Sequence, residues 1–106
     1  MIKLLILLIA IESGGDSKAI GDGGRAVGIL QIHPIMIREC NRITGRKRWT
    51  LADRLDPVES VKMCTLYLSY QRARKPEAGL VELGCSWNSG SIMKPLPKKY
   101  RAKLRE

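Results

Sequence analysis

The sequence predicts an all-α fold in one domain, and three observations support this. Apolar residues recur at helical spacing, two segments begin with strong helix-start signals, and no segment shows a strong strand pattern. The chain has 106 residues, 44% of them hydrophobic, which is enough for one modest core. Aromatic residues make up only 5% and phenylalanine is absent, so we expect a mainly aliphatic core. We expect residues 1–106 to form this single domain.

The first predicted helix covers residues 2–12, an almost uninterrupted apolar run that stops before the glycine pair 14–15. Glycine readily adopts the left-handed conformation that ends a helix. The run is too short to cross a bilayer, which takes roughly 20 apolar residues. With Lys3 it resembles a short signal peptide, but no small-x-small cleavage pattern follows Ile11, and cleavage after the glycines would remove Glu12. We therefore expect a retained, buried helix.

Residues 16–28 are polar and rich in glycine, which predicts a loop with a short hairpin-like excursion. A short apolar turn is expected over residues 29–33. Pro34 suits the first position of a second helix, because the missing N–H would have no partner there. We expect this helix to run to about Ile43.

A basic connector over residues 44–55 leads to the clearest helix start in the sequence. Asp56 is a favourable N-cap, Pro57 suits the first helical position, and Glu59 has the spacing of a capping box. We expect this third helix to end around residue 75, where a proline follows.

A fourth helix is expected over residues 77–87, followed by a loop over residues 88–91. A basic amphipathic tail, expected to be helical, runs from about Pro97 to the end. The tail either holds the protein on an anionic surface or is simply solvated. Its basic residues are Lys94, Lys98, Lys99, Arg101, Lys103 and Arg105.

The composition leaves the type of partner open. A net charge of +9 attracts polyanions, and nucleic acid and an anionic cell wall are both candidates. The three cysteines, Cys40, Cys64 and Cys85, are widely spaced and form no Cys-x-x-Cys pair. This pattern argues against a zinc site, even with His33 as a further ligand. Cys40 and Cys64 are predicted to be small core residues.

Glu12 is the residue whose position most suggests chemistry. It lies at the end of an apolar helix, and a carboxyl against apolar walls resists ionisation, as a general acid must. The glycines that follow leave room for a bulky polymer. The alternative is a solvated helix-end glutamate, and position alone favours that alternative.

Most other aromatic residues are assigned to packing. Trp49 is expected in the core rather than stacked on a sugar, and Tyr67 and Tyr70 are expected to pack along their helix. His33 precedes a helix start, and we expect no catalytic role for it.

Three short segments resemble the ordered motifs of the soluble lytic transglycosylase family. Each motif alone is weak, but their order and separations are specific, and the resemblance covers the chain from about Leu4 to Tyr100. It implies a lysozyme-like fold, nearest to the small phage-like branch and related to goose-type lysozyme. The segments are Glu12-Ser13-Gly14-Gly15, Gly28-Ile29-Leu30-Gln31-Ile32 and Trp87-Asn88-Ser89-Gly90.

The resemblance implies roles for individual residues. Glu12 matches the catalytic glutamate, and Ser13 matches a neighbour that contacts the sugar or orients the carboxyl. Gln31 and Asn88 match substrate-binding residues of the cleft. Tyr100 matches a late tyrosine near the catalytic carboxyl.

The implied reaction cleaves peptidoglycan between N-acetylmuramic acid and N-acetylglucosamine. With Glu12 as the single acid and base, the sugar's own C6 hydroxyl closes a 1,6-anhydro ring, and no water, metal or cofactor is needed. Most glycosidases use two carboxylates instead. Asp16 and Asp22 are the candidates for a second one, which would make the protein a goose-type hydrolase, whereas turn chemistry beside glycine is their other explanation.

A rival from another class is a basic, non-catalytic module that binds nucleic acid or the cell wall. It explains the charge and the tail, but it does not explain Glu12 or Gln31. It predicts salt-dependent DNA binding that is indifferent to Glu12. We favour a monomeric enzyme that acts on peptidoglycan strands at the bacterial cell wall, with no metal, no cofactor and no specific nucleic-acid partner.

Overall fold

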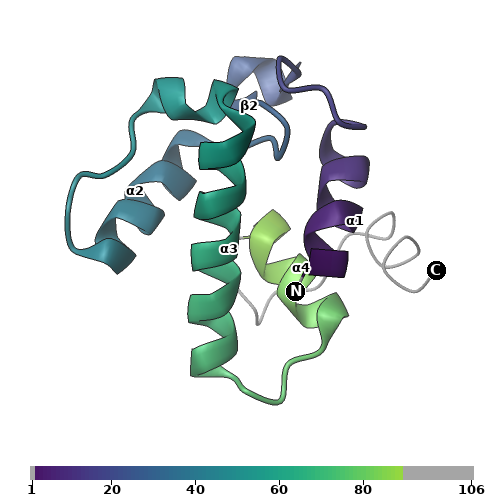
Figure 1. Cartoon of the computed structure of the whole chain (residues 1–106), viewed down its shortest axis with the longest axis vertical. Coiled ribbons are helices and arrows are strands. Elements are labelled where there is room, and N and C mark those ends of the chain that lie inside the picture. The colour runs from purple at the N-terminus through teal and green to yellow at the C-terminus, as the bar shows by residue number, and fades with distance from the viewer. Residues whose placement is uncertain (1, 90–106) are drawn as a thin grey trace.

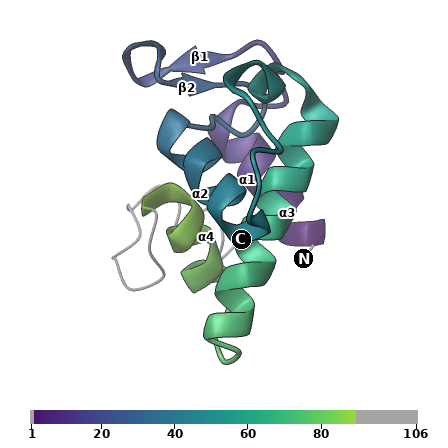
Figure 2. The ribbon, with the colours of Figure 1, turned by 90° about the vertical axis from the view of Figure 1, so that its left-hand side faces the viewer.

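The computed structural model describes residues 2–89, apart from the side chains of residues 85, 88 and 89. Four α-helices in this part pack together, and a small hairpin covers one end (Figures 1 and 2). The longest helix, α3, contacts each of the other three. The prediction of an all-α fold is confirmed. The helices are α1 (Ile2–Glu12), α2 (Pro34–Thr44), α3 (Pro57–Arg74) and α4 (Leu80–Ser89).

The hairpin lies within the predicted glycine-rich loop. Strands β1 (Ile20–Gly21) and β2 (Ala26–Val27) pair antiparallel, and the 3₁₀ helix η1 (Asp22–Gly24) joins them. β2 is also tied to the following turn through a bridge between Val27 and Ile32. The expected hairpin-like excursion is therefore present, although each strand is only two residues long.

Both predicted helix-start signals are confirmed. Pro34 begins α2, and Pro57 begins α3 with Asp56 as its N-cap. The Asp56 carboxylate accepts hydrogen bonds from the backbone N–H groups of Val58 at 2.9 Å and Glu59 at 3.4 Å. α2 ends one residue beyond the expected position, at a left-handed Gly45.

Three acidic side chains make contacts that the sequence analysis did not predict. Glu59 does not complete the predicted capping box: its Oε1 atom accepts the indole N–H of Trp49 at 3.0 Å, and the N–H of Asp56 donates to the carbonyl oxygen of Asp53 at 3.1 Å. Asp53 accepts the N–H of Thr50 and so helps to cap the 3₁₀ helix η2 (Leu51–Leu55). Glu82 likewise accepts the N–H of Gly79 at the start of α4.

α4 also differs from its expected bounds. It begins at Leu80 rather than at residue 77, and it continues to Ser89, so residues 88 and 89 are helical and not part of a loop. The predicted tail helix and its basic residues lie outside the described residues.

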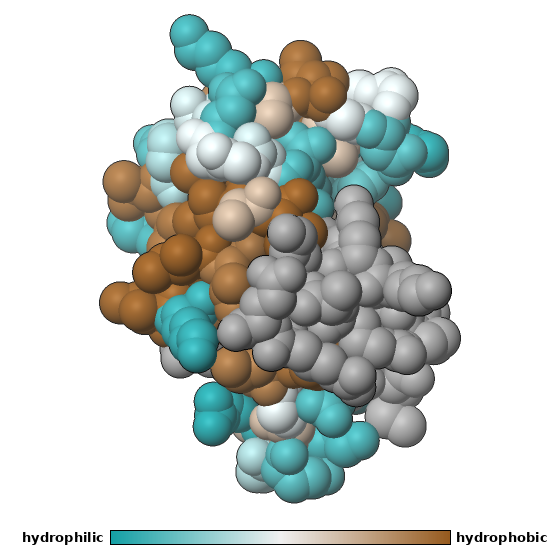
Figure 3. Space-filling view, turned by 90° about the vertical axis from the view of Figure 1, so that its right-hand side faces the viewer, coloured by the Kyte–Doolittle hydropathy of each residue, from teal (hydrophilic) through white to brown (hydrophobic). Residues whose placement is uncertain are grey.

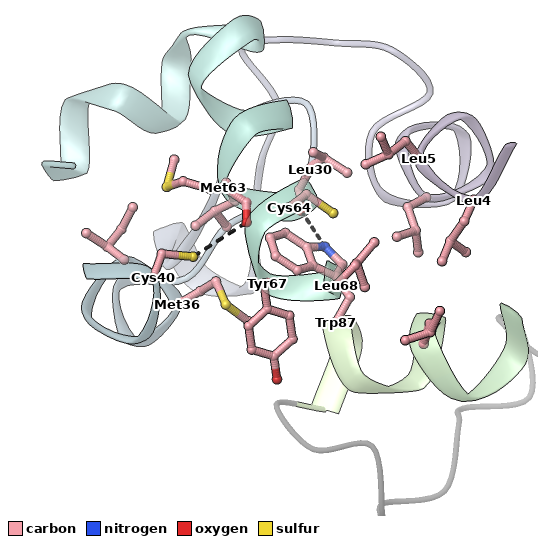
Figure 4. Packing of buried hydrophobic residues seen from close by; sticks show 14 of the residues in the cluster. Leu4, Leu5, Leu30, Met36, Cys40, Met63, Cys64, Tyr67, Leu68 and Trp87 are labelled. Carbon is pink, nitrogen blue, oxygen red and sulfur yellow. Dashed lines mark hydrogen bonds between the residues drawn. The ribbon is translucent and has the colours of Figure 1, made fainter. Parts of the chain in front are cut away.

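The core is aliphatic at its edges and aromatic at its centre (Figure 4). Tyr67 and Trp87 meet edge to face there, with ring centroids 5.8 Å apart. Trp49 is also buried, as predicted. Cys40 and Cys64 are free and buried, and burial is the main reason that the pKa of Cys40 rises to about 12.

The prediction of a buried first helix is only partly right. Leu4 and Leu8 of α1 are completely buried, but Ile2 and Ile6 remain 74% and 63% exposed. Figure 3 shows the apolar surface on this side of the molecule. No helix within residues 2–89 has both the length and the hydrophobicity to cross a membrane.

Candidate active site

Glu12 is the last residue of α1 and is half-buried. Burial is the main reason that the pKa of Cys64, on the neighbouring helix α3, rises well above its usual value, and negative charge at Cys40 and at Glu12 adds to the shift. Glu12 thus ends a helix that packs against α3, and its charge acts on this buried thiol.

The chain turns sharply after Glu12. Gly14 and Gly15 both have positive φ angles, 64° and 92°, which favour glycine. Among the described residues, a Cβ atom added at either position would meet nothing within 4 Å. The two glycines therefore border open space in this part of the chain, and room for a polymer beside the carboxyl remains a prediction.

Ser13 connects the end of α1 to the second motif. Its hydroxyl donates to the carbonyl oxygen of Ile29 at 2.7 Å and accepts the N–H of Gly15 at 3.1 Å. Ser13 therefore links two backbone segments through hydrogen bonds of its hydroxyl group. The resemblance implied a role next to the sugar or the carboxyl, and that role remains a prediction.

Gln31 holds the glycine-rich loop together. Its side-chain amide donates to the carbonyl oxygens of Ala19 and Gly28, each at 3.0 Å. The amide oxygen lies against Gly21, where any added Cβ atom would overlap it. Gln31 also has a positive φ of 49°, which is unusual for a residue with a side chain. Both amide hydrogens are used within the chain and the amide oxygen packs on Gly21, so the structure places Gln31 as a support of the loop, and its substrate-binding role remains a prediction.

Trp87 brings the third motif to the same place. Its indole N–H, buried within the core, donates to the carbonyl oxygen of Leu30 at 3.3 Å. The consecutive carbonyls of Ile29 and Leu30 thus accept hydrogen bonds from Ser13 and Trp87 respectively. We call this arrangement of Ser13, Ile29, Leu30 and Trp87 the motif junction. It joins three segments that are far apart in the sequence, directly beside Glu12.

Arg54 is a residue of this region that the sequence analysis missed. Its guanidinium donates to the carbonyl oxygens of Arg25 at 2.9 Å and Ile32 at 3.2 Å, which clamps the hairpin onto η2. The carbonyl oxygen of Arg54 also packs so closely on Gly28 that a Cβ atom there would overlap it. Nothing in the local sequence signals these contacts, because all of them go to distant backbone atoms.

The two candidate second carboxylates are exposed and held within their own loop. Asp16 accepts the backbone N–H of Lys18 at 2.9 Å, a turn contact of the kind aspartate favours. Asp22 pairs with His33 at 2.8 Å and with Arg25 at 3.4 Å. The hydrogen bond from His33 is the main cause that lowers the pKa of Asp22, and the charge of Arg25 acts in the same direction.

The remaining predicted site residues lie at or beyond the end of the described part of the chain. Asn88 is in the last turn of α4, and its side chain is not among those described. Tyr100 lies outside the described residues.

A pocket of about 370 Å³ lies elsewhere on the molecule and contains none of these residues. It is lined by Thr44, Arg48, Trp49, Val61, Lys62, Thr65 and Leu66. Within residues 2–89, no group of three or more His, Cys, Asp or Glu side chains is arranged to hold a metal ion.

These features define a helical domain that presents one carboxyl beside a glycine-rich loop. The family model described as Transglycosylase SLT domain matches residues 1–104, and the chain belongs to this family. The fold is therefore the lysozyme-like one that the motifs implied. Neither curated proteins nor solved structures provide a match. Family membership supports cleavage of peptidoglycan by a transglycosylase-type domain.

Proposed function

We propose that this protein is a lytic transglycosylase that cleaves the bond between N-acetylmuramic acid and N-acetylglucosamine, leaving a 1,6-anhydro end. Glu12 is the single catalytic acid and base. The protein acts as a monomer on glycan strands at the bacterial cell wall, and it needs neither metal nor cofactor.

The motif junction is the observation that carries this proposal. Hydrogen bonds from Ser13 and Trp87 to adjacent carbonyls fix the glycine-rich loop beside the end of α1. A general acid needs a fixed position relative to the glycosidic oxygen, because small displacements strongly reduce proton transfer. The space that the described residues leave free at Gly14 and Gly15 supports the approach of a polymer to this end of α1.

The chemistry proceeds in two proton transfers. Glu12 first donates its proton to the glycosidic oxygen, and the bond to the N-acetylmuramic acid C1 breaks. The substrate's acetamido oxygen stabilises the positive charge at C1, as in other substrate-assisted glycosidases. Glu12, now ionised, then removes the proton from the C6 hydroxyl, and the C6 oxygen closes on C1.

The contacts of Asp16 and Asp22 favour this single-carboxylate mechanism over hydrolysis. Each carboxylate is exposed and engaged in its own loop, by Lys18 in one case and by His33 and Arg25 in the other. A general base for water must face the sugar opposite the acid, roughly 6.5–9.5 Å from it in inverting enzymes. Holding these side chains in their own loop works against that placement.

Mass spectrometry of fragments released from purified peptidoglycan tests the proposal. Wild type is expected to release anhydro-ended fragments, and Glu12→Gln none, because an amide can neither donate nor accept the proton. Glu77→Gln, the same change at an exposed residue in another part of the molecule, is the matched control and should behave as wild type.

Other outcomes are equally informative. Reducing-ended fragments, lost in Asp16→Asn or Asp22→Asn, would replace the transglycosylase by a hydrolase. A folded wild type that releases nothing would leave a binding module as the better explanation.

A further inference from the structure

The basic charge of the described residues is concentrated in two segments. Residues 38–48 and 72–75 together carry eight lysines and arginines and one acidic residue, Glu39. The rest of residues 2–89 carries five basic and eight acidic residues. The end that holds the hairpin and Glu12 is therefore not the source of the positive charge.

The two basic segments meet at Tyr70. The guanidinium carbons of Arg42 on α2 and Arg74 on α3 lie 5.5 and 5.6 Å from the centroid of its ring. Because both distances are measured from the same centroid, the two guanidinium carbons are at most about 11 Å apart. Arg38 precedes Arg42 by one helical turn and is exposed on the same face of α2. We call Arg38, Arg42, Arg74 and Tyr70 the α2–α3 basic surface.

The guanidiniums of this surface are positioned in advance. Glu39 accepts two hydrogen bonds from Arg42, and Arg42 in turn lowers the pKa of Glu39. Arg74 donates to the side chain of Gln71 at 3.4 Å. The Arg42 side chain nevertheless remains 56% exposed, so it still presents N–H groups to solvent. Glu39 offsets part of this charge, since it is paired with Arg42 and also senses the charge of Arg74. Three guanidiniums against one carboxylate still leave an excess of positive charge, which favours an anion.

We propose that the α2–α3 basic surface binds a phosphodiester polymer attached to the cell wall and so holds the enzyme at its substrate. Guanidinium groups pair with phosphate through two parallel hydrogen bonds, whereas an uncharged glycan offers no partner for the cations. The choice of a wall polymer rather than nucleic acid rests on the proposed function.

The position of the surface allows both ligands to bind at once. Arg54 and Ser60 join the hairpin end to the start of α3, while Tyr70 lies ten residues further along that helix. At 1.5 Å per residue this separates the two regions by about 15 Å along the axis. Figure 1 shows the hairpin and the C-terminal end of α3 at opposite ends of the molecule.

Co-sedimentation of the full chain with purified walls tests the proposal. One sample of walls keeps its phosphodiester polymer, and hydrofluoric acid removes the polymer from the other. Arg42→Gln/Arg74→Gln is expected to bind intact walls roughly tenfold more weakly and to lower the salt dependence by about two phosphate contacts. Lys3→Gln/Lys18→Gln, which removes the same charge elsewhere, should bind nearly as wild type.

On stripped walls the two double variants and wild type should not differ. The proposal fails if the matched control loses as much binding, or if the Arg42/Arg74 defect persists on stripped walls. It also fails if that variant loses affinity only for duplex DNA. Arg42→Lys/Arg74→Lys retains the charge but not the paired donors, so it should restore the salt dependence and only part of the affinity, which separates a binding defect from misfolding.

The same samples distinguish this proposal from the proposed function. Fragment release from stripped walls should be equal for wild type and Arg42→Gln/Arg74→Gln, and absent for Glu12→Gln. If no protein releases fragments, the enzymatic proposal is wrong, while polymer-dependent binding still decides the role of the surface.

Discussion

The core and the motif junction hold the same small domain together by different means. In the core, side chains such as Leu8 and Leu68 pack without directional contacts. At the junction, side chains bond to backbone carbonyls, as Ser13 does to Ile29 and Trp87 to Leu30. Packed apolar cores tolerate volume-conserving exchange, whereas a hydrogen bond to a fixed carbonyl admits few alternative donors. The end of the molecule that holds the motif junction is therefore the part of the fold that tolerates fewer substitutions.

The largest expected loss of stability comes from adding a methyl group at Gly28, where the backbone packs directly on η2. Gly28→Ala should lower the free energy of unfolding by at least about 3 kcal/mol, because the new methyl group overlaps the Arg54 carbonyl and φ is 91°. Thermal unfolding measures this loss. Gly24→Ala has a matching φ of 92° but meets nothing within 4 Å, so it isolates the backbone penalty of about 1 kcal/mol. Equal losses would show that the close approach to Arg54 is unimportant.

A second comparison uses two aromatic neighbours. Trp87→Phe should cost about 2–3 kcal/mol, because the buried Leu30 carbonyl loses its donor. Tyr67→Phe should change stability by less than about 0.5 kcal/mol, since the buried Tyr67 hydroxyl has no hydrogen-bond partner in the described part of the chain. Urea unfolding of both variants checks the difference. A larger loss for Tyr67→Phe would reverse the view that the junction is the more sensitive region.

Ser13→Ala tests the junction with a smaller change. It should lower stability by about 1 kcal/mol and fragment release by roughly tenfold, because the Ile29 loop loses one of its ties to α1. Melting temperature and fragment release are measured together, with Ser17→Ala as the control for a nearby serine. A raised KM with an unchanged melting temperature would instead favour the direct sugar contact that the family resemblance implies.

The smallest effect is expected at the exposed hairpin. The pKa of Asp22 is lowered from 3.8, chiefly by the hydrogen bond with His33, so its ionised form is favoured in the folded state. That stabilisation is present above about pH 4 and is lost as pH falls through the lowered pKa. Melting temperatures of wild type and Asp22→Asn should therefore converge in acid. A gap that stays constant from pH 6 to pH 2 would contradict this assignment.

The sequence predicted those elements whose signals are local. Asp56 and Pro57 begin a helix because the cap and the proline act on their immediate neighbours. Glu59 has equally good local spacing, yet its carboxylate accepts the buried indole N–H of Trp49, and the backbone N–H of Asp56 donates to the carbonyl oxygen of Asp53 instead.

The sequence identified candidate site residues, but it did not predict the hydrogen bonds that hold them in place. Its motifs pointed to Glu12, Ser13 and Gln31, whereas the contacts that fix them end on the carbonyls of Ile29 and Leu30. A backbone carbonyl has no sequence signature, because every residue carries one. The same reason hides Arg54, whose guanidinium donates to the carbonyl oxygens of the distant residues Arg25 and Ile32 as well as to that of nearby Leu51.

The motif junction joins residues that are far apart in the sequence, and this separation determines when the junction can form during synthesis of the chain. Glu12 and Ser13 leave the ribosome early, but the tie from Trp87 to Leu30 spans 57 residues and joins only after most of the domain has been synthesised. Contacts of such long sequence separation form late in folding, because a long loop must close first. A nascent or truncated chain would thus carry Glu12 before the turn at Leu30 is fixed, and under the proposed mechanism cleavage of peptidoglycan would await a complete domain.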